Sequence, residues 1–234
     1  MAVQLLCPAP RECWPVRQLL FVGITLVVCL SFAQADTMTY SNSASFFSAI
    51  GTNLTDSYSE AGYAAFEIDN TGFALMTNAQ MDAVFGETTY VTTEFPNNNI
   101  VNNVGTPSAY YCAGCNGSFI LGFTSTTIGN AKGVFGVGFD VEGFTNPNEY
   151  AYVTFGDGST NNYLLTPGGY FGITSTLEIN SIAVGLMNGG LTDQLVGITD
   201  LTIGATPLAA VPEPASLVLL VAAIACVGSK LRKA

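Results

Sequence analysis

The stretch Val134-Phe135-Gly136-Val137-Gly138-Phe139-Asp140 decides the fold class of this chain. Bulky residues fall largely on alternate positions and glycines fill others, as expected of a strand that packs closely against a facing sheet. Further along, Phe155-Gly156-Asp157-Gly158-Ser159 contains an Asp-Gly pair, which favours positive φ angles. A hairpin turn is therefore predicted there, between two strands.

Short runs of β-branched and aromatic residues, bounded by Gly, Asn, Asp and Pro, continue in both directions. The predicted strands are 63–68, 73–77, 88–95, 117–124, 133–141, 150–155, 162–166, 170–174, 177–187 and 195–203. Loops are predicted at 97–99 and 146–148, and one helix at 43–50, which Gly51 ends. About ten strands without intervening helical patterns predict an all-β fold, an antiparallel β-sandwich of jelly-roll type with this short N-terminal helix.

The composition removes several kinds of chemistry. The 234 residues include no histidine, so a Ser-His-Asp triad and a His-ligated metal site are impossible. Of the 17 acidic residues only Glu12 and Glu213 lie outside residues 36–211, and of the six basic residues only Lys132 lies inside. This segment therefore has a formal charge of about −14. Nucleic-acid binding is excluded, because it depends on lysine and arginine contacts to phosphates.

The N-terminus has the pattern of a secretory signal peptide. Arg11 and Arg17 precede an apolar run at 19–32, and Ala33 and Ala35 are the small residues that signal peptidase needs. The sequence predicts a signal peptide at 1–35 and a mature chain from Asp36. A membrane anchor is the alternative, although the run is shorter than the ~20 residues of a span.

The C-terminus combines an extended motif with a short apolar segment. Val211-Pro212-Glu213-Pro214 precedes the apolar residues 217–228, and the basic cluster 229–233 follows. Twelve residues give a helix of ~18 Å, short of the ~30 Å hydrocarbon core, so this predicted C-terminal helix would be a marginal anchor. The prolines keep Glu213 extended, as a protease requires. A plain tail anchor is the alternative.

This order of motif, apolar segment and basic end resembles the PEP-CTERM sorting signal of secreted bacterial proteins. That resemblance implies a sorting signal at 208–234, recognised by the membrane protease-transpeptidase exosortase after transient anchoring in the inner membrane. It also implies export to the cell surface or the extracellular space. In four segments the 36–207 domain also resembles, less specifically, the main domains of PEP-CTERM proteins. Those domains look like carbohydrate-binding jelly rolls. The four segments are 45–50, 135–140, 170–173 and 198–204.

Cysteine usage agrees with export. Cys7, Cys13, Cys29 and Cys226 lie in the two terminal segments, which leaves Cys112 and Cys115 in the domain. An even pair in an oxidising compartment predicts a disulfide. Redox and metal roles are the alternatives, but the flanks predict strand and turn rather than a helix N-terminus, and no histidine or further cysteine completes a zinc site.

Three functions follow from these features. The first is a non-enzymatic protein of the cell surface or the matrix, associated with exopolysaccharide. The second is a calcium-assisted carbohydrate-binding module, with Asp140, Glu142 and Asp200 as ligands and Asp193 as a further option, because calcium prefers oxygen ligands. Solvated turn and edge carboxylates are the alternative interpretation. Stacking rings could come from Tyr110, Tyr111, Tyr150, Tyr152, Tyr163 and Tyr170, although core packing is the commoner role of tyrosine in a sandwich.

A glycoside hydrolase is the third and least favoured function. Glu149 or Glu142 could pair with Asp157, because two carboxylates suffice for glycoside hydrolysis. The spacing does not select them. We therefore expect no enzymatic activity and no cofactor, calcium aside.

Overall fold

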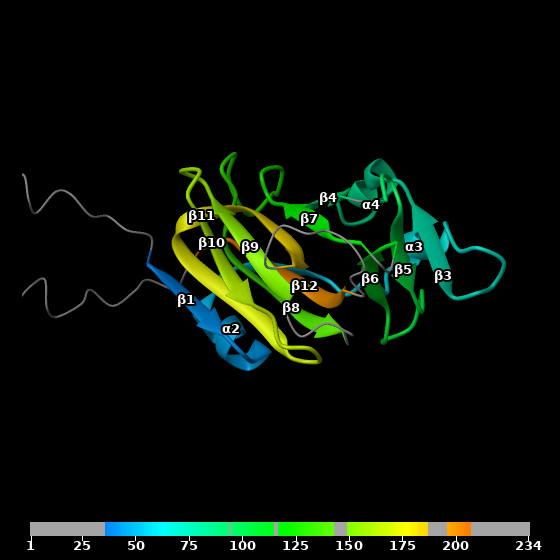
Figure 1. Ribbon diagram of the computed structural model, residues 1–234, viewed down its shortest axis with the longest axis horizontal. Helices are drawn as coiled ribbons and strands as arrows, with labels where there is room; N and C mark the ends of the chain where they lie inside the picture. The colour runs from blue at the N-terminus through cyan, green and yellow to red at the C-terminus, as the bar shows by residue number, and fades with distance from the viewer. Residues whose placement is uncertain (1–35, 94, 115–116, 143–148, 187–195, 207–234) are drawn as a thin grey trace, which may run out of the picture. The chain divides into compact units, whose positions relative to one another are not determined.

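The computed structural model describes residues 36–93, 95–114, 117–142, 149–186 and 196–206. These residues form a 12-stranded antiparallel sheet and three short helices (Figure 1). The strands are β1 (Thr37–Tyr40), β2 (Asn53–Asp56), β3 (Phe73–Met76), β4 (Thr89–Thr92), β5 (Asn99–Asn102), β6 (Tyr110–Ala113), β7 (Phe119–Gly122), β8 (Val134–Glu142), β9 (Glu149–Phe155), β10 (Thr160–Leu164), β11 (Tyr170–Leu186) and β12 (Gly197–Gly204). The helices are α2 (Ser43–Ala49), α3 (Ala61–Ala64) and α4 (Asn78–Phe85). The expected mostly β, antiparallel fold is confirmed.

Most of the predicted strands are present. Those expected at 73–77, 117–124, 133–141, 150–155, 162–166 and 195–203 are found to within two residues of their predicted ends. The predicted hairpin joins β9 to β10: Phe155 N–H donates to the carbonyl oxygen of Ser159 at 2.9 Å, and Gly158 has a φ of 85°. The Asp-Gly pair therefore makes the turn that its conformational preference predicts.

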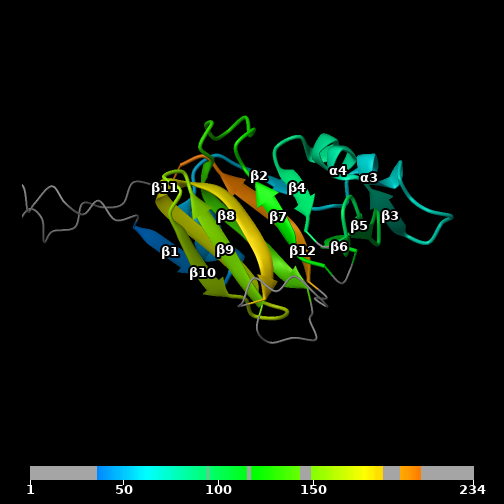
Figure 2. The same cartoon turned by 45° about the horizontal axis from the view of Figure 1, so that its top comes forward.

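Strand β11 pairs with four other strands. Its first part, 170–175, lies between β1 and β8, and its second part, 179–186, lies between β9 and β7. Figures 1 and 2 show it as a long curved ribbon. The prediction of two separate strands here is wrong because the backbone stays paired at the junction, where Thr176 N–H donates to Asp36 O at 3.1 Å.

Helix α2 packs on a face of the sheet that glycines leave open. A Cβ atom at Gly172 would lie 2.9 Å from the ring of Phe46, and one at Gly136 would lie 2.7 Å from Ile50. Phe46 is fully buried there. The glycines of β8 and β11 thus make room for a helix, whereas the sequence had suggested a facing sheet.

Helices α3 and α4 were not predicted. Helix α4 begins at a capping box, in which Thr77 and Gln80 satisfy each other's backbone N–H groups, and it ends at Gly86 with a φ of 77°. Helix α3 occupies part of the predicted strand 63–68. The strand prediction fails because the backbone forms a helical turn here, in which Tyr63 N–H donates to Glu60 O at 3.1 Å and Phe66 N–H donates to Tyr63 O at 3.0 Å. The Tyr63 side chain is fully buried.

Strand β5 begins at Asn99, where the sequence predicted a loop. The Asn99 side chain is buried and donates to Met76 O at 3.3 Å and to Asn78 Oδ1 at 2.8 Å. This asparagine is therefore an interior bridge between β5 and the start of α4. Strands β1 and β2, whose polar sequences gave no alternation, were also not expected.

Candidate functional site

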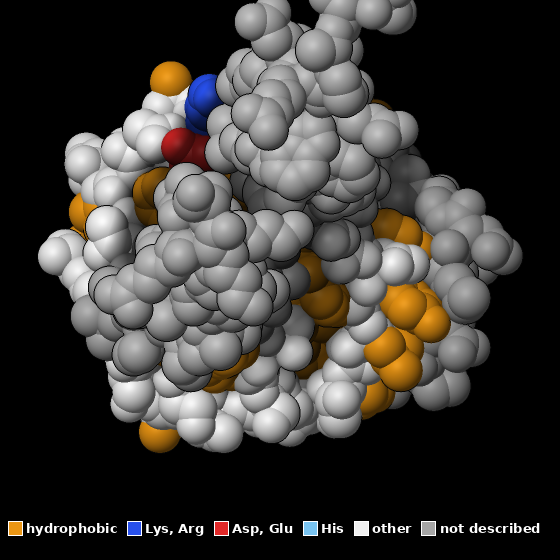
Figure 3. All heavy atoms as spheres, turned by 90° about the vertical axis from the view of Figure 1, so that its left-hand side faces the viewer, with side chains coloured by type: hydrophobic (Ala, Val, Ile, Leu, Met, Phe, Trp, Pro, Cys, Tyr) orange, Lys and Arg blue, Asp and Glu red, His pale blue; other side chains and the backbone are white. Residues whose placement is uncertain are grey.

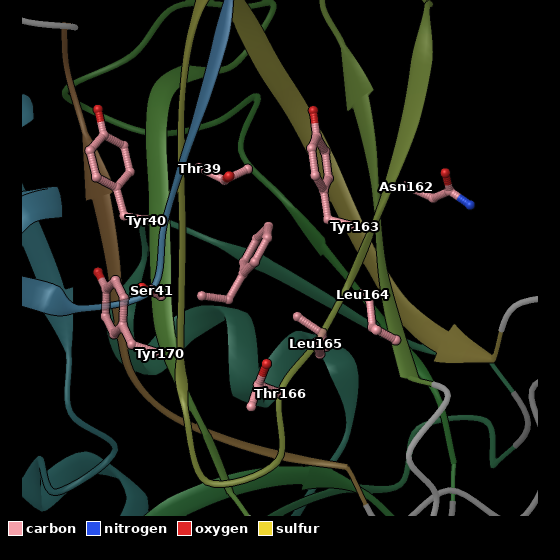
Figure 4. A pocket seen from close by; sticks show the side chains of 10 residues that line it. Thr39, Tyr40, Ser41, Asn162, Tyr163, Leu164, Leu165, Thr166 and Tyr170 are labelled. Atoms are coloured by element: carbon pink, nitrogen blue, oxygen red, sulfur yellow. The ribbon is translucent and has the colours of Figure 1, made fainter.

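A groove lies between β1, β10 and the start of β11 (Figure 4). Its volume is about 460 Å³, within the range of ligand-binding pockets. Within the described residues β1 pairs only with β11 and β10 only with β9, so both are edge strands. The lining residues are Thr39, Tyr40, Ser41, Asn162, Tyr163, Leu164, Leu165, Thr166, Tyr170 and Phe171.

The side chains that face the groove come from distant segments. Figure 4 shows Thr39 directed from β1 toward the space in front of Tyr163, with Leu165 and Thr166 below, and Asn162 directed away. The ring of Tyr163 packs against Phe171 with centroids 6.0 Å apart. The Tyr163 residue is half-buried, so part of it is available to a ligand.

One hydrogen bond connects the two edge strands across the groove. The Tyr163 hydroxyl donates to Thr37 Oγ1 at 3.4 Å and accepts from Asn161 Nδ2 at 3.1 Å. These bonds hold the ring in place. Tyr163 thus has a fixed orientation on an otherwise exposed strand.

The backbone of β1 is unpaired on the groove side at alternate residues. Since Thr176 N–H donates to Asp36 O, the even-numbered residues of this strand bond to β11. In an antiparallel pair the intervening residues turn their N–H and C=O groups the other way. The backbone groups of Thr37 and Thr39 therefore face the open edge.

The same argument applies to β10. Leu165 N–H donates to Glu149 O at 2.8 Å, so the odd-numbered residues bond to β9. The backbone groups of Asn162 and Leu164 therefore face the open edge, where Asn162 N–H donates to Asn161 Oδ1 at 3.0 Å and, among the described residues, the other groups are open. Two rows of neutral donors and acceptors thus border the groove.

Among the residues that the structure describes, no charged side chain lines the groove. None of its ten lining residues is Asp, Glu, Lys or Arg. The side chains of Thr39, Ser41, Asn162 and Thr166 make no hydrogen bond among the described residues, so their donors and acceptors are available. Figure 3 views the molecule from the left-hand side of Figure 1: a blue and a red group of atoms lie near the upper rim of this face, and hydrophobic side chains are scattered among polar atoms over the rest of its visible part.

Tyr40 and Tyr170 form an aromatic cluster with Phe46 of α2. Both tyrosine rings lie 5.8 Å from the Phe46 ring. The Tyr40 hydroxyl is 3.2 Å from Thr174 Oγ1, whereas the Tyr170 hydroxyl is buried and has no partner among the described residues. Burial, followed by the charges of Asp140 and Asp200, raises the pKa of Tyr170. These tyrosines chiefly pack α2 onto the sheet.

The structure brings the predicted calcium ligands only partly together. Asp140 lies opposite Tyr170 in the pairing of β8 with β11, and burial, then Asp200, then Glu142 raise its pKa. Asp200 lies in the irregular part of β12 with a φ of 51°. Among the described residues there is no group of three or more acidic, His or Cys side chains that could hold a metal ion. Calcium binding stays a prediction, and Asp193 lies outside the described residues.

The other candidate stacking tyrosines lie away from the groove. Tyr111 is fully buried in the core. The rings of Tyr150 and Tyr152 lie 6.2 Å apart on β9, and Tyr110 is half-buried on β6. Of the six tyrosines, only Tyr163 and Tyr170 line the groove.

Glu149 and Asp157, one of the carboxylate pairs proposed for hydrolysis, do not lie close together. Glu149 begins β9 and Asp157 lies in the turn beyond its end, so at ~3.3 Å per residue they are separated by roughly 20 Å. Glycosidase carboxylates are about 5–9.5 Å apart. Burial raises the pKa of Glu149 to about 7, and neither of its carboxylate oxygens has a partner among the described residues. Glu142 is exposed at the end of β8.

A buried polar cluster around Asp56 was not predicted. The Asp56 carboxylate accepts hydrogen bonds from Tyr63 Oη at 2.5 Å, Tyr90 Oη at 3.1 Å and Tyr58 N at 2.9 Å. Burial raises its pKa to about 7, and the hydrogen bonds from Tyr63 and Tyr58 oppose this rise. The sequence gave no signal for this cluster, because Tyr58 and Tyr63 follow Asp56 without a recognisable motif and Tyr90 comes from β4, 34 residues away.

Some predictions fall wholly or partly outside the described residues. The structure records Cys112 as disulfide-bonded, on a strand followed by Gly114 with a φ of 56°. Cys115 lies outside the described residues. So do the signal peptide at 1–35 with Ala33 and Ala35, and the sorting signal with Val211, Pro212, Glu213 and Pro214. No helix in the described part of the chain is long and apolar enough to cross a membrane.

Neither a protein-family model nor a curated protein nor a solved structure matches this chain. The functional argument therefore depends on its own residues.

Proposed function

We propose that this chain is an exported, non-enzymatic protein of the cell surface or the matrix, and that its groove binds a polysaccharide. The observation that carries the binding proposal is the lining between β1 and β10, which combines a half-buried tyrosine, the unbonded hydroxyls of Thr39, Ser41 and Thr166, and no charged side chain. Sugars present apolar C–H faces and many hydroxyls. An aromatic ring with neutral donors and acceptors nearby complements both features.

Export is proposed from the two ends of the sequence. An apolar run followed by Ala33 and Ala35 supports cleavage by signal peptidase. The motif Pro212-Glu213-Pro214, followed by an apolar segment and a basic cluster, supports sorting by exosortase. A polysaccharide ligand fits that destination, because an exported protein meets exopolysaccharide outside the inner membrane.

A finer fold is proposed as well. Strand β11 pairs with β1 and β8 along its first part and with β9 and β7 along its second. Strands that pass from one sheet to another in this way make the corners of sandwiches. We propose that the strands form the two layers of a β-sandwich, arranged as in a jelly roll, with the groove between the outer strands of the layers.

The glycan proposal is tested with Tyr163→Ala. Affinity electrophoresis of the full-length chain in gels containing dextran, xylan, galactomannan or hydroxyethyl cellulose should reveal retardation by at least one of them. Loss of the ring should weaken that binding by about tenfold or more. Tyr110→Ala removes a half-buried tyrosine outside the groove and should leave binding unchanged.

Two results would overturn the glycan proposal. One is the absence of retardation in every gel, and the other is retardation that Tyr163→Ala and Tyr110→Ala reduce equally. Capture of extended peptides in place of glycans would assign the two free strand edges to β-strand addition instead. Circular dichroism of each variant verifies that it is folded.

Calcium-assisted binding is the second candidate. It is favoured by the proximity of Asp140 and Asp200, whose charges interact without a neutralising lysine or arginine nearby in the described residues. Calcium at these carboxylates should raise the melting temperature at millimolar concentration, and a chelator should reverse the rise. A melting temperature that calcium does not change would eliminate this candidate.

A further inference from the structure

We infer that the groove selects by charge: it takes an extended, uncharged polysaccharide and rejects the same backbone when that carries carboxylates. This inference rests on the proposed glycan binding and narrows it to one ligand class.

The first argument is the absence of a cation at the groove. A carboxylated sugar loses hydration on binding, and the usual compensation is a lysine or arginine partner. No lining residue has a positive charge. Lys132 is the one lysine or arginine in residues 36–211, and it lies near Asp157 and Glu178 instead. Hydrogen bonds from Ser159 and Asn130, and to a smaller extent the Lys132 charge, lower the pKa of these two carboxyl groups.

The second argument is the electrostatic field of the negatively charged domain. With about 15 carboxylates against one lysine between residues 36 and 211, the domain repels anions at long range. At 10 mM salt the screening length is about 30 Å, whereas at 1 M it is about 3 Å. Rejection of acidic chains should therefore be strong at low salt and weak at high salt.

The third argument is the direction of the groove's polar groups. The open edges present the backbone groups of Thr37 and Thr39 on one side, and the Asn162 carbonyl with the backbone groups of Leu164 on the other, since Asn162 N–H donates to Asn161 Oδ1. Both edges offer a donor and acceptors, and a sugar hydroxyl can serve as either partner. A chain that extends along the strands can use successive groups, so the arrangement suits linear polymers.

The test compares polymers that differ in charge but share a backbone. Hydroxyethyl cellulose is paired with carboxymethyl cellulose, and methyl-esterified homogalacturonan with its de-esterified form. Affinity electrophoresis of the full-length chain should give at least about tenfold tighter binding to the neutral member at 10 mM salt. The ratio should fall toward one at 500 mM salt. Equal binding, or tighter binding to the acidic member, at 10 mM salt would overturn the inference.

Two lysine variants test whether the groove itself, rather than the net charge of the domain, discriminates against acidic polymers. Thr166→Lys places a cation in the groove, and Thr160→Lys places one on an exposed position of β10 outside the lining. Both change the net charge equally, so only Thr166→Lys should markedly improve binding of the acidic polymers. Equal effects of the two variants would show that the groove does not select, and the inference would fail. Binding of no polymer in either pair would instead refute the proposed function itself.

Discussion

The hydroxyl of Tyr63 donates a 2.5 Å hydrogen bond to the carboxylate of Asp56 in the interior of the domain. Both residues are fully buried. The carboxyl group shares no ion pair there, since Lys132 is the one cation between residues 36 and 211 and lies among other carboxylates. The protonated state of Asp56 is accordingly favoured by folding.

We predict that the contribution of Asp56 to stability falls as the pH rises from about 4 to about 7. The pKa of Asp56 is about 3.8 in the absence of burial and about 7 in the fold, so the folded state binds the proton more tightly. Its contribution is complete below about pH 4, decreases between pH 4 and 7, and is lost above the folded pKa; it amounts to a few kcal/mol. Asp56→Asn should make the urea-derived free energy of unfolding less dependent on pH than that of the parent. Parallel pH profiles for both proteins would refute this.

Gly172 should not tolerate a side chain while Phe46 occupies the adjacent site. A methyl group at Gly172 would meet the Phe46 ring at 2.9 Å, so Gly172→Ala should destabilise the fold by about 1–3 kcal/mol. Phe46→Ala removes the ring, and the double variant should therefore lose less stability than the sum of the two single variants. Strictly additive losses in chemical denaturation would mean that α2 does not rest on this glycine.

The predicted Cys112–Cys115 disulfide should act locally. Closing so short a loop contributes about 2 kcal/mol on the chain-entropy model, so Cys115→Ala should lower the free energy of unfolding by about that amount. A thiol reductant should lower the free energy of unfolding of the parent protein by the same amount and leave that of the variant unchanged. Alkylation of both thiols in the non-reduced exported protein would refute the pairing.

Replacing Pro212, Glu213 and Pro214 with alanine should block processing. Without the extended motif the sorting enzyme has no substrate, and the chain should stay in the membrane fraction at its unprocessed mass. Pro207→Ala, outside the motif, should be processed normally. Release of the triple variant at the parental mass, measured by mass spectrometry of the culture medium, would contradict the sorting proposal.

The predictable part of the fold is the part with strong local signals. Strands β8 and β9 and the turn after Phe155 follow from alternation and an Asp-Gly pair. Helix α4 also has a local signal, the Thr77 and Gln80 capping box with Gly86 at the end, but its apolar periodicity is too weak to predict a helix. The continuity of β11 was missed because its middle, Ser175-Thr176, is polar and depends on pairing with β1, over 130 residues earlier.

The candidate site was predictable only in part. Tyr163 was among six possible stacking tyrosines, but Thr39 and Thr166 carry no signal of their own. They become groove residues because two edge strands, separated by more than a hundred residues, end up next to each other. The Asp56 cluster has the same origin, since Tyr90 reaches it from β4. Long-range pairing of this kind leaves no periodic trace in a single sequence.

Strand β11 pairs with two sets of neighbouring strands, and this affects how the sheet can open. Detaching β11 would remove a hydrogen-bonded partner from β1, β8, β9 and β7 at the same time, so no half of the sheet can open while the other keeps its pairings intact. Amides in all five strands should therefore exchange with deuterium through a common, global opening rather than in independent stages.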